Sequence, residues 1–154
     1  MKKVLIALDY DPSAQKVLDS GFSLAKAMKA EIVMLHVIAS PTYYSSLEYS
    51  PITGFAGYID MTNSQLNSIE GLKAATSAYL DKLKHHMGDK SAETVVMEGD
   101  SADSILAVAK EYHRDIIVLG SHSRNWLENI VMGSVTEKVL RHTSIPMFII
   151  PVKK

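Results

Sequence analysis

Hydrophobic and polar positions along the chain alternate between two periods. Short runs of β-branched and other apolar residues are typical of strands that are buried on both faces of a sheet. Five such runs occur, at KVLIAL (3–8), EIVMLHVI (31–38), AETVVME (92–98), DIIVLG (115–120) and PMFIIPV (146–152). Between these runs, apolar residues recur every three or four positions, which is the spacing of an amphipathic helix.

Four helices are predicted between the strands, and the first and the third have start signals as follows. Asp11 is a residue type favoured at an N-cap, and Pro12 suits the first helical position. The third helix begins behind Gly99, with Asp100 or Ser101 as its cap. The predicted helices are DPSAQKVLDSGFSLAKAMK (11–29), residues 64–87, SADSILAVAKEYH (101–113) and SVTEKVLRH (134–142).

The order of elements is therefore βαβαβαβαβ. Strands that alternate with helices of this length pair in parallel through right-handed crossovers, which places helices on both faces of the sheet. We expect an α/β fold with an open five-stranded parallel sheet, formed by residues 1–154 as a single domain. Residues 39–63, with two prolines, two glycines and five aromatic residues, interrupt the pattern. They are interpreted as a surface excursion, with a lid or a partner surface as the alternative.

Composition narrows the class of protein. A chain of 154 residues fits one domain, and the absence of cysteine excludes disulfides, thiol catalysis and zinc–thiolate sites. A formal net charge of −1 gives no basic field for nucleic acid. No run of eighteen apolar residues is present, so no transmembrane helix is expected. We therefore expect a cytoplasmic protein.

Candidate binding residues follow the strands. Ligands of open α/β sheets bind beyond the carboxyl ends of the strands, where the strand order reverses. Three stretches compete for that place: ALDYD (7–11), HVIAS (36–40) and GSHSRNWLENIVMGSVTEK (120–138). If the first and fourth strands are central neighbours, Asp9 and Gly120 face each other across the crevice.

Gly133 and Ser134 begin the last predicted helix. The first amides of a helix have no partner within it, and together with the helix dipole they favour an anion. The segment Ser134 to Glu137 also fits the S-x-x-E capping box, in which the helix satisfies its own amides. A serine is able to cap a helix and still donate its hydroxyl to a phosphate, so both readings stay open.

The closing half of the chain, DIIVLGSHSRNWLENIVMGSVTEKVLRHTSIPMFIIP, resembles the universal stress protein family. Nucleotide-binding members of that family carry G-x-x-G, nine residues, and then G-[ST]. Here Gly120, Ser123, the nine residues 124–132 and Gly133-Ser134 reproduce that spacing. VLIALDYDPSA, EIVMLHVI and GDSADSILAVAKEYHRDIIVLG resemble the family's other segments, so the resemblance covers almost the whole chain except residues 39–63.

The resemblance implies a Rossmann-like sheet of strand order 3-2-1-4-5 and a regulator that binds ATP, with AMP or ADP as alternatives and Mg²⁺ as a possible companion. Asp9 takes the ribose hydroxyls in this reading, and Gly120 lets the backbone approach the phosphates. The other implied ligand residues are Ala7 and Val37 beside the adenine, Gly133, Ser134, Val135 and Thr136 at the β- and γ-phosphates, and Leu119 and Ser123 within the binding set.

Ser123 departs from the family pattern, because it stands where the motif has its second glycine. If that position requires a positive φ, a serine there costs on the order of 1 kcal/mol. We therefore expect ATP binding that is weakened rather than abolished, since 1.4 kcal/mol is about tenfold in affinity. The alternative is a nucleotide-free dimeric adaptor of the same family.

Catalytic motifs are absent. The six histidines form no recognised metal-ligand spacing, GSHS is not the G-x-S-x-G elbow, and GSHSRN lacks the P-loop lysine. A slow ATPase or an autophosphorylating enzyme is the remaining alternative, although the sequence shows no general base for it.

The last predicted strand is the expected contact with a second copy of the chain. An exposed apolar sheet edge is an aggregation hazard unless it is covered or paired. Antiparallel pairing of Pro146–Val152 with its twin solves this, and the family resemblance likewise implies a homodimer. A further protein partner is expected but not identifiable.

Overall fold

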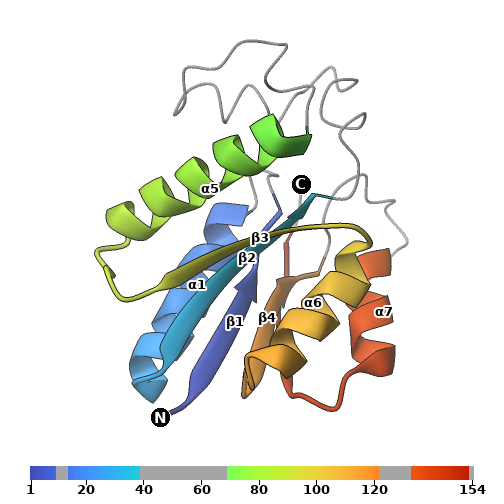
Figure 1. The fold of residues 1–154 in the computed structure, drawn as a ribbon. Helices are drawn as coiled ribbons and strands as arrows, with labels where there is room; N and C mark the ends of the chain where they lie inside the picture. The colour runs from blue at the N-terminus through green and yellow to red at the C-terminus, as the bar shows by residue number, and fades with distance from the viewer. Residues whose placement is uncertain (10–13, 39–68, 122–132, 153–154) are drawn as a thin grey trace.

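The computed structural model describes residues 1–9, 14–38, 69–121 and 133–152, and Figure 1 shows their arrangement. The strands are β1 (Lys3–Ala7), β2 (Glu31–Ile38), β3 (Glu93–Glu98), β4 (Ile116–Gly120) and β5 (Met147–Ile150). The helices are α1 (Ala14–Met28), α5 (Ile69–His86), α6 (Ser101–Glu111) and α7 (Ser134–His142).

All five strands form one parallel sheet. Its order is β3-β2-β1-β4-β5, which confirms the predicted fold class and strand order. β1 lies between β2 and β4, with Ile6 opposite both Met34 and Val118. Because the strands are parallel, their carboxyl ends meet at one edge of the sheet.

Helices cover both faces of the sheet. Successive side chains of a strand point to opposite faces, so Val4 and Ile6 join the core that includes residues of α1 and α5. Leu5 and Ala7 join the other core, which includes residues of α6 and α7. α6 and α7 pack against each other on that second face (Figure 1). The site at the carboxyl edge therefore rests on a three-layer scaffold.

The observed boundaries refine the predicted ones. Asp100 is the N-cap of α6, as one of the two predicted alternatives, and its Oδ1 accepts a hydrogen bond of 2.9 Å from the amide of Asp103. The predicted helix over 64–87 is observed as α5, and its first five predicted residues lie outside the described ones. The predicted start at Asp11 and Pro12 and the segment 39–63 also lie outside them. None of the helices in the described ranges has the length and hydropathy of a membrane span.

Candidate functional site

The candidate site lies at the carboxyl edge of the sheet, between β1 and β4. The chain leaves β1 toward β2 on one side and leaves β4 toward β5 on the other. The edge therefore has a topological switch point between its two central strands, which is where open α/β sheets bind ligands. Asp9 follows β1 by two residues and is half-buried, and Gly120 is the last residue of β4. The structure thus brings these two predicted residues to neighbouring strand ends.

An apolar surface lies beside the switch point. Ala7, Val37 and Leu119 are buried near the ends of three consecutive strands, β1, β2 and β4. All three belong to the core on the α6 and α7 face, and Val135 packs against the same core from α7. The predicted apolar residues are therefore on one face and at one edge of the sheet.

The helix α7 begins without a side-chain cap, so the predicted capping box is wrong. Gly133 is the N-cap, in an extended conformation with φ −69° and ψ 156°, and Ser134 is already the first helical residue. A capping box needs its serine at the N-cap position, one residue earlier. The carboxylate of Glu137 instead accepts a hydrogen bond of 2.7 Å from Nη2 of Arg141, one turn further along the helix.

This start leaves the first amides of α7 without the partner that sequence reasoning had assigned to them. Such amides, at the positive end of the helix dipole, favour a negatively charged group. Ser134 is exposed, and Gly133 and Val135 are half-buried. The first turn of α7 is therefore able to present its main-chain amides, together with the Ser134 hydroxyl, to an anion.

Thr136 has a different role from its neighbours in the first turn. Its side chain is buried, and its hydroxyl donates a hydrogen bond of 2.8 Å to the carbonyl of Gly120. That hydrogen is consequently used inside the protein and ties the first turn of α7 to the end of β4. Only the main-chain amide of Thr136 remains as its contribution to an anion site.

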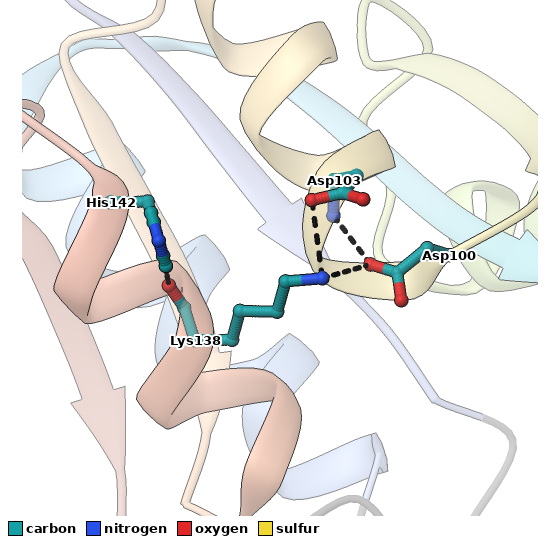
Figure 2. A network of polar contacts seen from close by, with 4 residues as sticks. All are labelled: Asp100, Asp103, Lys138 and His142. Carbon is teal, nitrogen blue, oxygen red and sulfur yellow. Dashed lines mark hydrogen bonds and ion pairs between the residues drawn. The ribbon is translucent and has the colours of Figure 1, made fainter.

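A charged network joins α7 to the start of α6 (Figure 2). The Nζ atom of Lys138 lies 3.1 Å from Oδ1 of Asp100 and 3.3 Å from Oδ1 of Asp103. One turn on, Nδ1 of His142 lies 2.8 Å from the carbonyl oxygen of Lys138. The amide of Asp103 and the ammonium of Lys138 hold the pKa of Asp100 below its ordinary value. The bonds to Asp100 and Asp103 raise the pKa of Lys138. Asp100 and Lys138 therefore both stay ionised near neutral pH.

Sequence reasoning missed both the Thr136 contact and the Lys138 network. The bonded residues are 16 positions apart in the first contact and 38 in the second, so no local sequence pattern indicates them. It also missed Ser121, which is buried directly after β4 and whose carbonyl accepts a hydrogen bond of 2.6 Å from the amide of Gly133. Ser123, the residue that departs from the family motif, lies outside the described residues.

Metal-binding chemistry has no support in the described parts of the chain. No group of three His, Cys, Asp or Glu residues is placed there to hold a metal ion. His36 is buried in β2, and its Nδ1 lies 2.8 Å from the carbonyl oxygen of Leu8. This histidine therefore links β2 to the residue that leads into Asp9.

The model of the universal stress protein family matches residues 1–151. The chain belongs to the universal stress protein family. Universal stress protein YxiE of Bacillus subtilis is 31% identical over 154 residues, and the match covers 96% of this chain and 97% of the length of YxiE. Universal stress protein MJ0577 of Methanocaldococcus jannaschii is 24% identical over 99% of this chain and 96% of its own.

Solved universal stress proteins share the fold. The structure of MJ0577 superposes with a TM-score of 0.70 at 24% identity and covers 99% of this chain and 97% of its own. A universal stress protein solved in complex with cAMP gives a TM-score of 0.65 at 17% identity, covering 97% of this chain and 96% of its own. At these identities the likeness establishes the α/β architecture alone.

Proposed function

We propose that this universal stress protein binds an adenine nucleotide, ATP foremost, between β1 and β4, and acts as a homodimeric regulator in the cytoplasmic stress response. The observation that carries the proposal is the start of α7. Gly133 caps the helix without a side chain, and Thr136 ties the same turn to Gly120 at the switch point. These contacts support the proposal, because they hold a helix start that suits an anion at the edge where Asp9 also lies.

The three parts of a nucleotide match three groups of residues. The carboxylate of Asp9 is able to accept hydrogen bonds from both ribose hydroxyls. The buried side chains at the ends of β1, β2 and β4 offer the apolar surface that suits a purine. The amides of Ser134, Val135 and Thr136, with Gly120, Ser123 and Gly133 beside them, are the proposed phosphate donors. The adenine neighbours are Ala7, Val37 and Leu119.

The relative solved with cAMP supports the ligand class, because cAMP is itself an adenine nucleotide. Its phosphate is esterified to the ribose 3′ oxygen, so cAMP offers one free ribose hydroxyl where ATP offers two. It also carries one phosphate rather than three. If Asp9 and α7 act as proposed, this chain binds ATP more tightly than cAMP.

Isothermal titration calorimetry tests the proposal directly. ATP, ADP, AMP and cAMP are titrated into the purified protein, with Mg²⁺ and again with a chelator. We expect saturable binding, with affinity rising from AMP to ATP as more phosphate reaches α7. The absence of saturable heat for ATP up to millimolar concentration contradicts the proposal and leaves the nucleotide-free adaptor. A preference for AMP assigns a different nucleotide to the site.

The proposed homodimer forms through the last strand. β5 pairs with β4 along one side and is at the end of the sheet, and Phe148 on it is 41% exposed. An apolar edge of this kind is stabilised by pairing with a second copy over Pro146–Val152. Light scattering after size exclusion should return about twice 16.9 kDa. A monomer at micromolar concentration refutes this part of the proposal.

A further inference from the structure

Ser121 contacts the last strand and the last helix at once. It directly follows β4, and its side chain is buried. Its amide donates a hydrogen bond of 2.9 Å to the carbonyl of Ile150, which continues the ladder between β4 and β5 by one residue. Its carbonyl accepts the bond from the amide of Gly133, the N-cap of α7.

The register between β4 and β5 shows that the carbonyl of Ser121 has been diverted. Gly120 pairs with Ile150, so the next position places Ser121 opposite Pro151. In a parallel ladder, the amide of Val152 then bonds to the carbonyl of Ser121. The structure instead has the amide of Val152 donating to Oγ of Ser121 at 2.9 Å. The hydroxyl therefore replaces the carbonyl in the ladder, and the carbonyl is released to hold Gly133.

The end of the last strand is also held from the opposite face of the sheet. The Nζ atom of Lys16, in α1, donates a hydrogen bond of 2.7 Å to the carbonyl of Pro151. Val152 itself is buried. The main chain at Val152 is therefore expected to move only together with Ser121. A displacement of Ser121 in turn changes its bond to Val152 or its bond to Gly133.

We infer that Ser121 couples the anion site at the start of α7 to the strand through which a second copy pairs. An anion that binds the first turn of α7 strengthens the bond from Gly133 to Ser121, and Oγ of Ser121 then fixes the exit of β5. This inference rests on the proposed nucleotide binding and on the proposed dimer. Coupling between two sites is reciprocal, so ATP tightens the dimer by the same factor as dimerisation tightens ATP binding.

The contact itself is tested without ligand, by amide hydrogen exchange measured with NMR. Ser121→Ala removes Oγ, so the amides of Val152 and Gly133 must share one carbonyl. Both are expected to exchange about two- to tenfold faster than in the wild type, as for the loss of one hydrogen bond. Ser121→Thr keeps the hydroxyl and restores slow exchange. Ser104→Ala is the matched control, because Ser104 is equally buried but lies in α6. Unchanged exchange at Gly133 in Ser121→Ala overturns the inference.

The coupling is tested by measuring the dimer dissociation constant with and without ATP in sedimentation experiments. In the wild type, saturating ATP is expected to tighten the dimer by at least about fivefold. Ser121→Ala should reduce that factor to about one, and Ser121→Thr should preserve it. The coupling is overturned if ATP leaves the dimer dissociation constant of the wild type unchanged. It is also overturned if ATP tightens the Ser121→Ala dimer as much as the wild-type dimer. If the wild type binds no ATP, the proposed function fails, and the exchange rates at Gly133 alone decide whether Ser121 holds the helix start.

Discussion

The uncapped start of α7 predicts a substitution with opposite effects on stability and on ligand binding. Gly133 is the N-cap, yet it offers no side chain to the amides of the first turn. Its φ of −69° is accessible to every L-residue, so replacing this glycine introduces no backbone strain. We expect Gly133→Asp to stabilise the ligand-free protein and to abolish most of its affinity for ATP.

The stabilising effect has three sources of known size. A capping carboxylate improves on glycine by a few tenths of a kcal/mol. A negative charge at the dipole adds about 0.3–1 kcal/mol, and the loss of glycine's freedom in the unfolded chain adds about 0.4–1 kcal/mol. A net gain of about 1 kcal/mol is a cautious total. For a chain of this length it raises Tm by roughly 2–4 °C.

The effect on binding is larger, because the new carboxylate stands where a phosphate charge would bind. Two like charges about 4 Å apart repel by about 4 kcal/mol at an effective dielectric constant of 20. Gly133 is half-exposed, so solvent reduces this repulsion. A loss of about 1.5–4 kcal/mol remains, which is more than tenfold in affinity.

Two further variants separate charge from shape. Gly133→Asn caps the helix almost as well as Asp but carries no charge, so it should stabilise the protein and weaken ATP binding by only about fivefold. Gly133→Ala adds a side chain that does not cap, and should not raise Tm as the Asp variant does. Thermal unfolding and calorimetric titration of all three are compared with the wild type. Equal ATP affinity in the Asp variant and the wild type refutes the phosphate site at α7.

Three other predictions follow from the described contacts. Asp9→Asn should weaken ATP binding by about tenfold or more, because charge-assisted hydrogen bonds to the ribose are lost. The affinity for inorganic triphosphate, measured in a competition titration, should stay unchanged. Equal losses of affinity for both ligands contradict the ribose role of Asp9. Asp100 has a lowered pKa in the folded state, so its stabilisation is complete above its ordinary pKa and is lost as pH falls through the lowered one. The free energy of unfolding, measured with urea, should therefore fall less between pH 7 and pH 3 in Asp100→Asn, which keeps the cap, than in the wild type. Phe148→Glu should halve the mass in light scattering while leaving the circular dichroism spectrum unchanged, and an intact dimer argues against pairing through β5.

The architecture was predictable because its signals are local. Each strand is a short apolar run between polar residues, and β2, with every residue from Ile32 to Ile38 buried, needs such a run to lie between two other strands. The alternation with helices then selects a parallel sheet. The strand order came from the family resemblance, since the pairing of β1 with β4 joins residues more than a hundred positions apart.

The start of α7 was mispredicted because the local signal competes with a distant contact. Ser134 and Glu137 have the spacing of a capping box. The amide of Gly133, however, is bonded to the carbonyl of Ser121, and Gly133 takes the extended N-cap geometry. That contact moves Ser134 into the helix, and a pattern confined to four residues contains no information about it.

The same distant contacts would allow a short helix to serve as the proposed binding element. α7 is held at Gly133 by Ser121, at Thr136 by Gly120, and at Lys138 by the start of α6. An anion that binds its first turn therefore does not have to bear the cost of ordering that turn, which otherwise reduces affinity. Affinity at this site then depends on side chains that never touch the ligand. Substitutions at Thr136 or Lys138 should consequently weaken binding even though one side chain is buried and the other points toward α6.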